Sequence, residues 1–254
     1  MQEQRETNTW LNSRKKDIPD GIWAKCPECG EILYNGELDR NLRICLKCKY
    51  YFPMNPKDRI DMLIDEGTFY KYEEPKLVNT SEFDNIIITG EGLLSGYRVV
   101  IMIINLNFKK GINGLGIGEK VINTINQAVD KKLPLLSVCT SFKGESIDEG
   151  IFYPALSVSI SATINELDRN KLAYVSVISQ SLSDSLFPGF VYNGDIVIAE
   201  SNVLGESHTG SRIGRREAER NINVLFEKSV VDMIVPRREL KESLSNILSF
   251  LSYT

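Results

Sequence analysis

Four of the five cysteines form two Cys-x2-Cys pairs, Cys26/Cys29 and Cys45/Cys48, with fifteen residues between the pairs. Four thiolates at this spacing can close tetrahedrally on one zinc ion, each about 2.3 Å from the metal. Four cysteine ligands fill the coordination sphere, so such an ion holds a fold together and does not activate water. Two disulfides or a redox Cys-x-x-Cys are the alternatives, and the doubled motif disfavours both. The pattern predicts a four-cysteine zinc site with a small hairpin between the pairs.

The cellular compartment of the protein also bears on whether the cysteines bind zinc or form disulfides, because thiols stay reduced inside the cell. The N-terminal segment, residues 1–22, is polar and has no apolar core of the secretory type. The longest wholly apolar run, residues 99–104, is far too short to cross a membrane. A net charge of -4 gives no global basic field that would favour nucleic acid. We therefore expect an interior compartment, no membrane partner and no nucleic-acid partner.

Beyond the cysteines, apolar runs alternate with helical patterns. We expect an N-terminal arm over residues 1–22, a zinc ribbon over 23–52 and a larger domain over 53–254. In that domain we expect strands within residues 86–108, 133–141, 173–179, 194–201 and 232–236, and helices over 57–67, 117–130, 152–167 and 240–251. The strand runs are apolar enough to be covered on both faces, which predicts an α/β fold. Periodicity leaves open whether the sheet is doubly wound or a spiral of ββα units.

A family resemblance resolves that choice. The segment WAKCPECGEILYNGELDRNLRICLKCKYYFPMNPKDRIDMLIDEGTF resembles the N-terminal region of the carboxyltransferase beta subunit of bacterial and plastid acetyl-CoA carboxylase. The likeness includes a hairpin over residues 34–42 and a helix ending at 65–67, and it resumes at GEKVINTINQAVDKKLPLLSV, NGDIVIAES and EKSVVDMIVPRREL. It implies a crotonase-like ββα superhelix, and a cytoplasmic or plastid-stroma location. It also implies carboxyl transfer from carboxybiotin to acetyl-CoA, giving malonyl-CoA.

The resemblance also implies where an acyl thioester would bind. In the family, backbone N–H groups in two glycine-containing loops form an oxyanion hole that stabilises the enolate. In this chain the first loop is FKKGINGLGIG, where Gly111, Gly114 and Gly118 match family glycines and Lys110 replaces another. The resemblance assigns oxyanion-hole N–H groups to the neighbourhood of Gly111 and Ile112, with Gly114 as a substrate-binding position. A plain strand–helix loop is the alternative.

The second and third loops depart further from the family. In SFKGESIDEG, Lys143 replaces a family glycine before Gly144, Glu145 replaces an alanine and Asp148 a glutamine. Lys143 and Gly144 are the second expected pair of oxyanion-hole N–H groups. In the third loop, Asp184 stands where the family has a glycine. Glu145, Asp148 and Asp184 are therefore candidate acid–base groups, although any one of them could be an ordinary solvated loop residue.

Three functional hypotheses follow. The first is a carboxyltransferase-beta-like enzyme that works with an alpha-type subunit, or self-associates, and meets a biotin or acyl carrier protein. The second is a biotin-independent decarboxylase or hydratase of coenzyme A or carrier-protein thioesters. The third is a non-catalytic partner of a true carboxyltransferase subunit.

Arg212 is a candidate contact for a coenzyme A or pantetheine phosphate, with a solvated helical face as the alternative. Cys139, in an apolar run, is expected to be a small buried hydrophobe.

Overall fold

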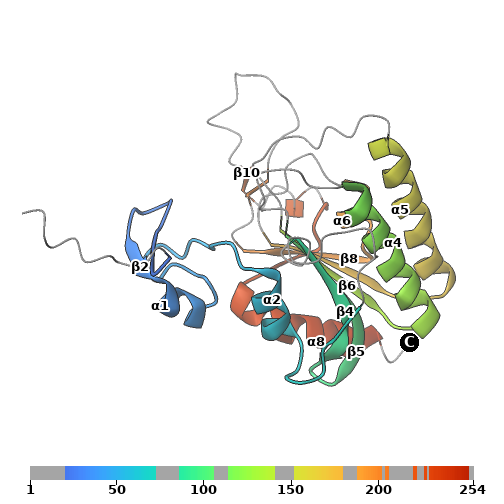
Figure 1. The fold of residues 1–254 in the computed structure, drawn as a ribbon, viewed down its shortest axis with the longest axis horizontal. Coiled ribbons are helices and arrows are strands. Elements are labelled where there is room, and N and C mark those ends of the chain that lie inside the picture. The colour runs from blue at the N-terminus through green and yellow to red at the C-terminus, as the bar shows by residue number, and fades with distance from the viewer. Residues whose placement is uncertain are drawn as a thin grey trace, which may run out of the picture. The chain divides into compact units, whose positions relative to one another are not determined.

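The computed structural model describes residues 21–72, 86–105, 114–140, 152–179, 188–201, 204–205, 220–221, 226–227 and 229–251. The chain divides into two compact units, Met1–Phe52 and Pro53–Thr254 (Figure 1). No helix within the described ranges is both long and apolar enough to cross a membrane.

The helices and strands occur in the order expected of an α/β chain. The strands are β1 Trp23–Lys25, β2 Ile32–Tyr34, β3 Tyr70–Lys71, β4 Ile87–Leu94, β5 Tyr97–Asn105, β6 Leu135–Thr140, β7 Tyr174–Ile178, β8 Ile196–Glu200, β9 Leu204–Gly205, β10 Arg220–Asn221 and β11 Met233–Val235. The helices are α1 Asn35–Arg40, α2 Pro56–Leu63, α4 Gly114–Lys131, α5 Phe152–Arg169, α6 Pro188–Val191, the 3-10 helix Arg237–Glu239 and α8 Leu240–Leu251.

The smaller unit differs from the sequence expectation between the two cysteine pairs. Strands β1 and β2 form an antiparallel hairpin around the first pair. The predicted hairpin over residues 34–42 is wrong, because residues 35–40 form helix α1. This helix buries Leu38, which is 1% exposed, in a small cluster with Leu33, Phe52 and the cysteines. Burial of one leucine against the cysteine cluster outweighs the turn tendency of Asn35-Gly36.

The larger unit is built on a seven-stranded sheet in the order β11-β8-β7-β6-β5-β4-β3. Strands β5, β6, β7, β8 and β11 are mutually parallel, whereas β4 pairs antiparallel with β5 and β3 with β4. A two-residue turn, Ser95-Gly96, joins β4 to β5, and both residues have positive φ, 50° and 87°. Glycine adopts this conformation without the steric cost that a side chain carries.

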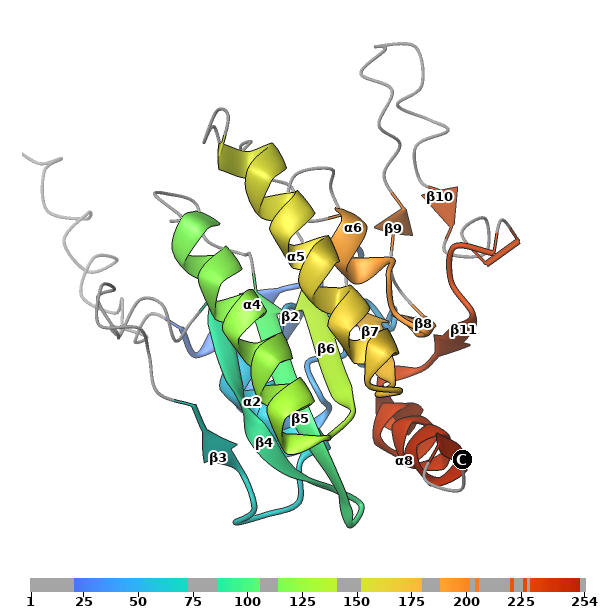
Figure 2. The ribbon, with the colours of Figure 1, turned by 90° about the vertical axis from the view of Figure 1, so that its right-hand side faces the viewer.

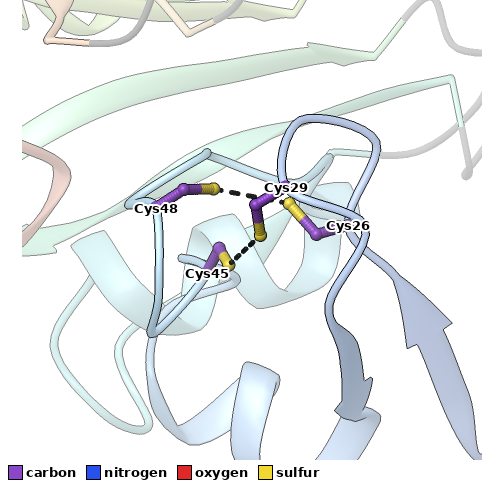
Figure 3. A group of neighbouring side chains, drawn as sticks. All are labelled: Cys26, Cys29, Cys45 and Cys48. Carbon is purple, nitrogen blue, oxygen red and sulfur yellow. Dashed lines mark hydrogen bonds between the residues drawn. The ribbon is translucent and has the colours of Figure 1, made fainter.

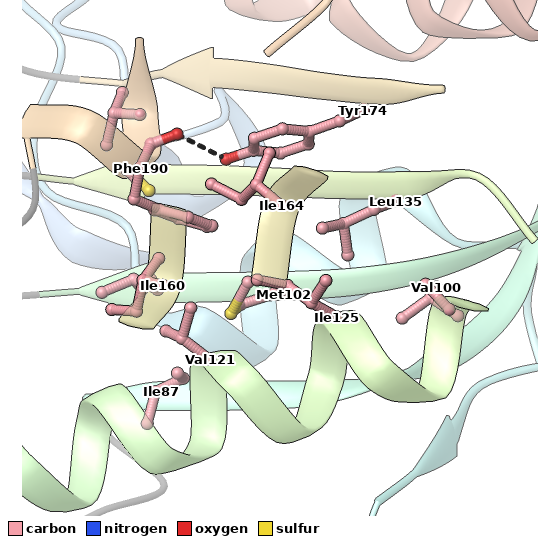
Figure 4. Packing of buried hydrophobic residues seen from close by; sticks show 14 of the residues in the cluster. Ile87, Val100, Met102, Val121, Ile125, Leu135, Ile160, Ile164, Tyr174 and Phe190 are labelled. Carbon is pink, nitrogen blue, oxygen red and sulfur yellow. Dashed lines mark hydrogen bonds between the residues drawn. The ribbon is translucent and has the colours of Figure 1, made fainter. Parts of the chain in front are cut away.

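Two apolar layers cover the sheet, one on each face. Figure 2 shows α4 and α5 side by side across one face, and Figure 4 shows the side chains packed between them and the strands. That cluster includes Val121 and Ile125 of α4 and Ile160 and Ile164 of α5. Helices α2 and α8 pack on the opposite face, where Leu63 meets Ile101 in a second cluster. Successive strand residues point to opposite faces, so the strands are buried on both sides, as their composition predicts.

Gly118 allows α4 and α5 to approach closely. A Cβ atom added to Gly118 would lie 2.4 Å from both Cδ atoms of Leu156 on α5. Gly118, one of the three glycines of the first loop that match the family, therefore lies inside α4 and has a packing role.

Helix α2 ends earlier than the sequence suggested. Asn55 caps its N-terminus by accepting a hydrogen bond from the Asp58 N–H at 2.8 Å. The helix ends at Leu63, whereas we expected it to reach residues 65–67. Asp65 instead accepts hydrogen bonds from the Ser95 and Gly96 N–H groups and from Lys241 at 2.8–3.1 Å. The carboxylate thus ties the β4–β5 turn and α8 to this segment, which holds the chain out of the helix.

Candidate functional site

The four paired cysteines come together in the smaller unit (Figure 3). Their sulfur atoms all lie within 4.8 Å of one another, with Cys26–Cys48 at 3.5 Å and Cys29–Cys45 at 3.8 Å. These separations are much longer than a disulfide bond, which is about 2.05 Å. Four sulfurs placed tetrahedrally about 2.3 Å from zinc would be roughly 3.8 Å apart. The arrangement therefore fits a closed, structural zinc site and excludes paired disulfides at these positions.

The surroundings of the sulfurs shift the pKa values of Cys45 and Cys48 in opposite directions. Burial opposes ionisation of Cys45, but N–H groups of Cys48 and Lys47 point at its sulfur and lower its pKa to about 7. The Tyr50 N–H lowers the pKa of Cys48, yet burial and the other three thiols raise it to about 12. Four sulfurs this close cannot all ionise without a positive charge between them.

Cys139 is separate from the cluster and matches its expected role. It is 4% exposed in β6, and burial raises the pKa of its thiol to about 12. A protonated, buried thiol is unreactive, so Cys139 acts as a small core residue.

The second notable region is the edge of the sheet where the parallel strands end. Because β5, β6, β7 and β8 run in one direction, their carboxyl ends lie along the same edge. Each of these ends carries a buried polar residue: Asn105, Thr140, Ser179 and Glu200 are 0–6% exposed. In open α/β sheets, ligands bind outside the carboxyl ends of the strands. This edge is the candidate ligand-binding site.

The sequence-predicted loops follow these strand ends along the chain. Gly114 is the first residue of α4. The other candidates lie outside the described residues: Gly111, Ile112, Lys143, Gly144, Glu145, Asp148, Asp184 and Arg212.

One group at this edge was missed by sequence reasoning. Glu200, at the end of β8, accepts hydrogen bonds from Arg59 of α2 and from Arg237, with the Arg237 contacts at 2.9–3.2 Å. Ser179, just after β7, donates to Glu200 at 2.8 Å and accepts from Arg59. Arg59, Ser179, Glu200 and Arg237 are each at most 2% exposed. Burial opposes ionisation of Glu200, but Arg59 and Arg237 lower its pKa below the usual value. A charged residue ending an apolar strand was the available signal.

A pocket of about 440 Å³ lies away from this edge, between α4 and the β3 side of the sheet. Tyr70, Tyr72, Lys120 and Lys131 line it together with polar residues of α4. Lys131 pairs with Glu91 at 2.8 Å, and the Lys120 Nζ donates to the Ile87 carbonyl at 2.9 Å. Gly114, which lies within the described ranges, is not among its lining residues.

Comparison with known proteins agrees with the cysteine geometry. Residues 23–48 match the acetyl-CoA carboxylase zinc finger domain, a range that includes all four clustered cysteines. The chain is 34% identical, over 268 aligned positions, to the acetyl-coenzyme A carboxylase carboxyl transferase subunit beta of Desulforamulus reducens. That alignment covers 96% of this chain and 92% of the relative. The chloroplastic subunit beta of Pyropia yezoensis is 29% identical, with 99% and 96% covered.

Solved structures of the same fold match about four-fifths of this chain. Transcarboxylase 12S, described as a hexamer assembly, has a TM-score of 0.58 at 14% identity, covering 78% of this chain and 41% of that one. A Pseudomonas malonate decarboxylase hetero-dimer has a TM-score of 0.54 at 16% identity, covering 79% of this chain and 86% of that one. The geranyl-CoA carboxylase beta subunit of P. aeruginosa has a TM-score of 0.57 at 16% identity, covering 77% and 43%.

The expected crotonase-like carboxyltransferase fold with an N-terminal zinc ribbon is therefore confirmed. Because sequence identities of 30–34% extend over 93–96% of the chain, the chain belongs to the acetyl-CoA carboxylase carboxyltransferase beta subunit family.

Proposed function

We propose that this chain is the thioester-handling subunit of a carboxyltransferase, moving a carboxyl group from carboxybiotin to an acyl-CoA, with acetyl-CoA as the family's substrate. The observation that carries the proposal is the 34% identity to a carboxyl transferase subunit beta over 96% of the chain. The similarity spans the zinc ribbon and the sheet, so it is not explained by the ribbon alone.

The proposed chemistry forms one carbon–carbon bond. The methyl carbon of acetyl-CoA loses a proton and bonds to the carboxyl carbon of carboxybiotin; the N–C bond breaks, and the ureido nitrogen takes up a proton. The thioester oxygen carries negative charge as the enolate forms, so it needs N–H donors. We assign this role to main-chain N–H groups around Gly111, Ile112, Lys143 and Gly144, with Gly114 and Arg212 binding substrate. Gly111 precedes α4, whose N-terminus favours negative charge.

We propose that Cys26, Cys29, Cys45 and Cys48 hold one structural zinc ion. The support is the mutual approach of the four sulfur atoms, all within 4.8 Å of one another, and the match of residues 23–48 to a zinc finger domain. Such a site requires reduced thiols, so we propose the cytoplasm, or a plastid stroma, as the compartment.

We further propose an alpha-type carboxyltransferase subunit as the partner, with self-association as the alternative, and a biotin carrier protein as the donor. Support comes from the solved structures of the same fold, which are described as a hetero-dimer, a hetero-tetramer and a hexamer assembly.

A second candidate function rests on the loop substitutions. Glu145, Asp148 and Asp184 place carboxylates where the resembling family has alanine, glutamine and glycine. Carboxylates beside an oxyanion hole serve as acids or bases in decarboxylation and hydration. A biotin-independent decarboxylase or hydratase of acyl-CoA or acyl-carrier thioesters is the reaction class this favours.

Mass spectrometry of a thioester panel tests these assignments. Acetyl-, malonyl-, methylmalonyl- and crotonyl-CoA, and their carrier-protein forms, are incubated with the chain alone, and then with an alpha-type subunit and biocytin. The proposal expects malonyl-CoA to become acetyl-CoA only when the partner and biocytin are both present. Loss of CO2 or gain of water with the chain alone would establish the second function. No conversion in either arm indicates a non-catalytic partner.

A substitution then tests the oxyanion-hole assignment. Gly144→Val restricts the backbone at the proposed N–H donor, so we expect turnover to fall by about 10²–10³-fold, the usual cost of losing one oxyanion donor. Ser146→Val is the matched control, because it adds the same β-branched shape in the same loop. Equal activity in the two variants would refute the assignment.

A further inference from the structure

We propose that Glu200 and its three partners, Arg59, Ser179 and Arg237, form a clamp that positions the carboxyl edge of the sheet for the reaction. We call these four residues the Glu200 clamp. The inference rests on the proposed function only in its kinetic consequences.

The first observation is where the clamp lies. Ser179 follows β7, Glu200 ends β8, and Arg237 comes two residues after β11. These strands are neighbours in the order β11-β8-β7. Arg59 comes from α2, and it is 141 residues from Glu200 in sequence. One carboxylate therefore joins the ends of three parallel strands to a helix on one face of the sheet.

The second observation is that the polar groups of the Glu200 clamp hydrogen bond to one another. Both Glu200 oxygens accept from guanidinium groups, and the Ser179 hydroxyl bridges Glu200 and Arg59. The Ser179 N–H also donates to the Cys139 carbonyl at 2.9 Å, so the end of β7 is fixed to β6. The Ser201 N–H donates to the Val235 carbonyl at 3.1 Å, which fixes the end of β8 to β11. The chain that follows β7 and β8 starts from these fixed points.

Energetics argue that the clamp sets geometry more than stability. Burying three charged groups carries a large desolvation cost, which their mutual attraction offsets only with good geometry. Replacing such a group entirely with apolar residues is often neutral or stabilising, whereas removing one charged partner is costly. A misplacement of about 1 Å at a reacting centre costs about 10²-fold in rate. The Glu200 clamp therefore affects the reaction rate mainly by fixing the positions of the strand ends at the site edge.

The experiment compares two designs with a matched control in the full chain, assayed with its alpha-type subunit, malonyl-CoA and biocytin. Ser179→Ala removes the bridging hydroxyl. Ser137→Ala is the control, since Ser137 is also fully buried in the sheet but hydrogen bonds to Tyr174 in mid-strand. The triple variant Arg59→Met, Glu200→Leu, Arg237→Met makes the clamp apolar.

We expect Ser179→Ala to lower kcat at least about 10-fold with little change in KM, and the triple variant to lower it about 100-fold while remaining folded. Hydrogen exchange at Ser179 and Ser201 should quicken in both, but not in Ser137→Ala. The inference is overturned if Ser179→Ala and Ser137→Ala match in kcat and in exchange, or if a folded triple variant keeps full turnover. A wild-type chain without transfer activity refutes the proposed function, and exchange at the two amides still decides whether the clamp holds the strand ends.

Discussion

Replacing Cys45 with serine tests whether the ribbon depends on a four-thiolate metal site. Cys45 is fully buried, and its sulfur is 3.8 Å from that of Cys29. Serine is nearly the same size, so Cys45→Ser removes a thiolate ligand without leaving a large cavity. The expected loss is therefore one metal bond and not packing.

The magnitude follows from the ligand count. Structural zinc contributes about 10–16 kcal/mol of apparent free energy in zinc-finger peptides, or about 2.5–4 kcal/mol for each of four equal ligands. Since about 1.4 kcal/mol is tenfold in affinity, one lost thiolate should weaken zinc binding by about two to three orders of magnitude. Among the described residues, the buried members of the ribbon cluster besides cysteines are Leu33, Leu38 and Phe52. Such a small core does not hold a fold without its metal.

The assay combines zinc content with tryptophan fluorescence. Trp23 packs edge-to-face on Tyr34, with ring centroids 5.6 Å apart, so its emission reports the β1–β2 hairpin. A Trp10→Phe background isolates that signal. In competition with a chelator, Cys45→Ser should release zinc at roughly 100-fold lower chelator concentration, with a shift in Trp23 emission. Cys139→Ala is the control and should keep one zinc per chain. A Cys45→Ser protein with full zinc and unchanged emission would refute the site.

Three further predictions concern the larger unit and are measured by urea unfolding. Gly118→Ala should lower the free energy of unfolding by about 1–2 kcal/mol despite alanine's helix propensity, because the added methyl group overpacks against Leu156. The same substitution in a Leu156→Ala background should not carry this penalty. A Gly118→Ala protein that is more stable than the wild type would contradict the close approach of α4 and α5. Lys241 and the N–H groups of the β4–β5 turn lower the pKa of Asp65. The free energy of unfolding of the wild type should therefore exceed that of Asp65→Asn above about pH 4, and this difference should be lost as the pH falls through the lowered pKa of the folded state. A difference that does not change with pH would contradict the prediction. Tyr174→Phe should lower the free energy of unfolding by about 1–3 kcal/mol, since the buried Ser137 hydroxyl loses its Tyr174 partner and the Phe190 carbonyl keeps the longer Asn193 N–H contact at 3.4 Å. An unchanged urea midpoint would contradict it.

Regular periodicity made much of the fold predictable. The phase of residues 117–130 places Ile117, Val121 and Ile125 on the face of α4 that is fully buried. The cysteine spacing alone indicated the metal cluster. The order of the strands in the seven-stranded sheet was not predictable from the apolar runs, because such runs do not encode which strands are neighbours.

The features that sequence reasoning missed depend on contacts between distant segments. Helix α1 forms where the family resemblance implied a hairpin over residues 34–42, because Leu38 packs against Leu33, which precedes the helix, and Phe52, which follows it. The Glu200 clamp unites Arg59 with Glu200 across 141 positions, so no local pattern reveals it. The glycine loops were interpreted by resemblance alone, and their chemistry stays a prediction.

The strand order of the sheet bears on how the protein is made. From β3 to β8 each strand pairs with the strand synthesised just before it, and β11 joins last. The sheet can therefore grow strand by strand as the chain leaves the ribosome, which synthesises the N-terminal part first. Helix α8 follows every strand of the sheet in the chain, yet Leu240, Leu244 and Leu248 cover the face that includes Ile101. Until α8 is made, only α2 of the described helices covers this apolar face of the nascent sheet. The interval between the synthesis of β11 and that of α8 is therefore the one in which a chaperone has most apolar surface to protect.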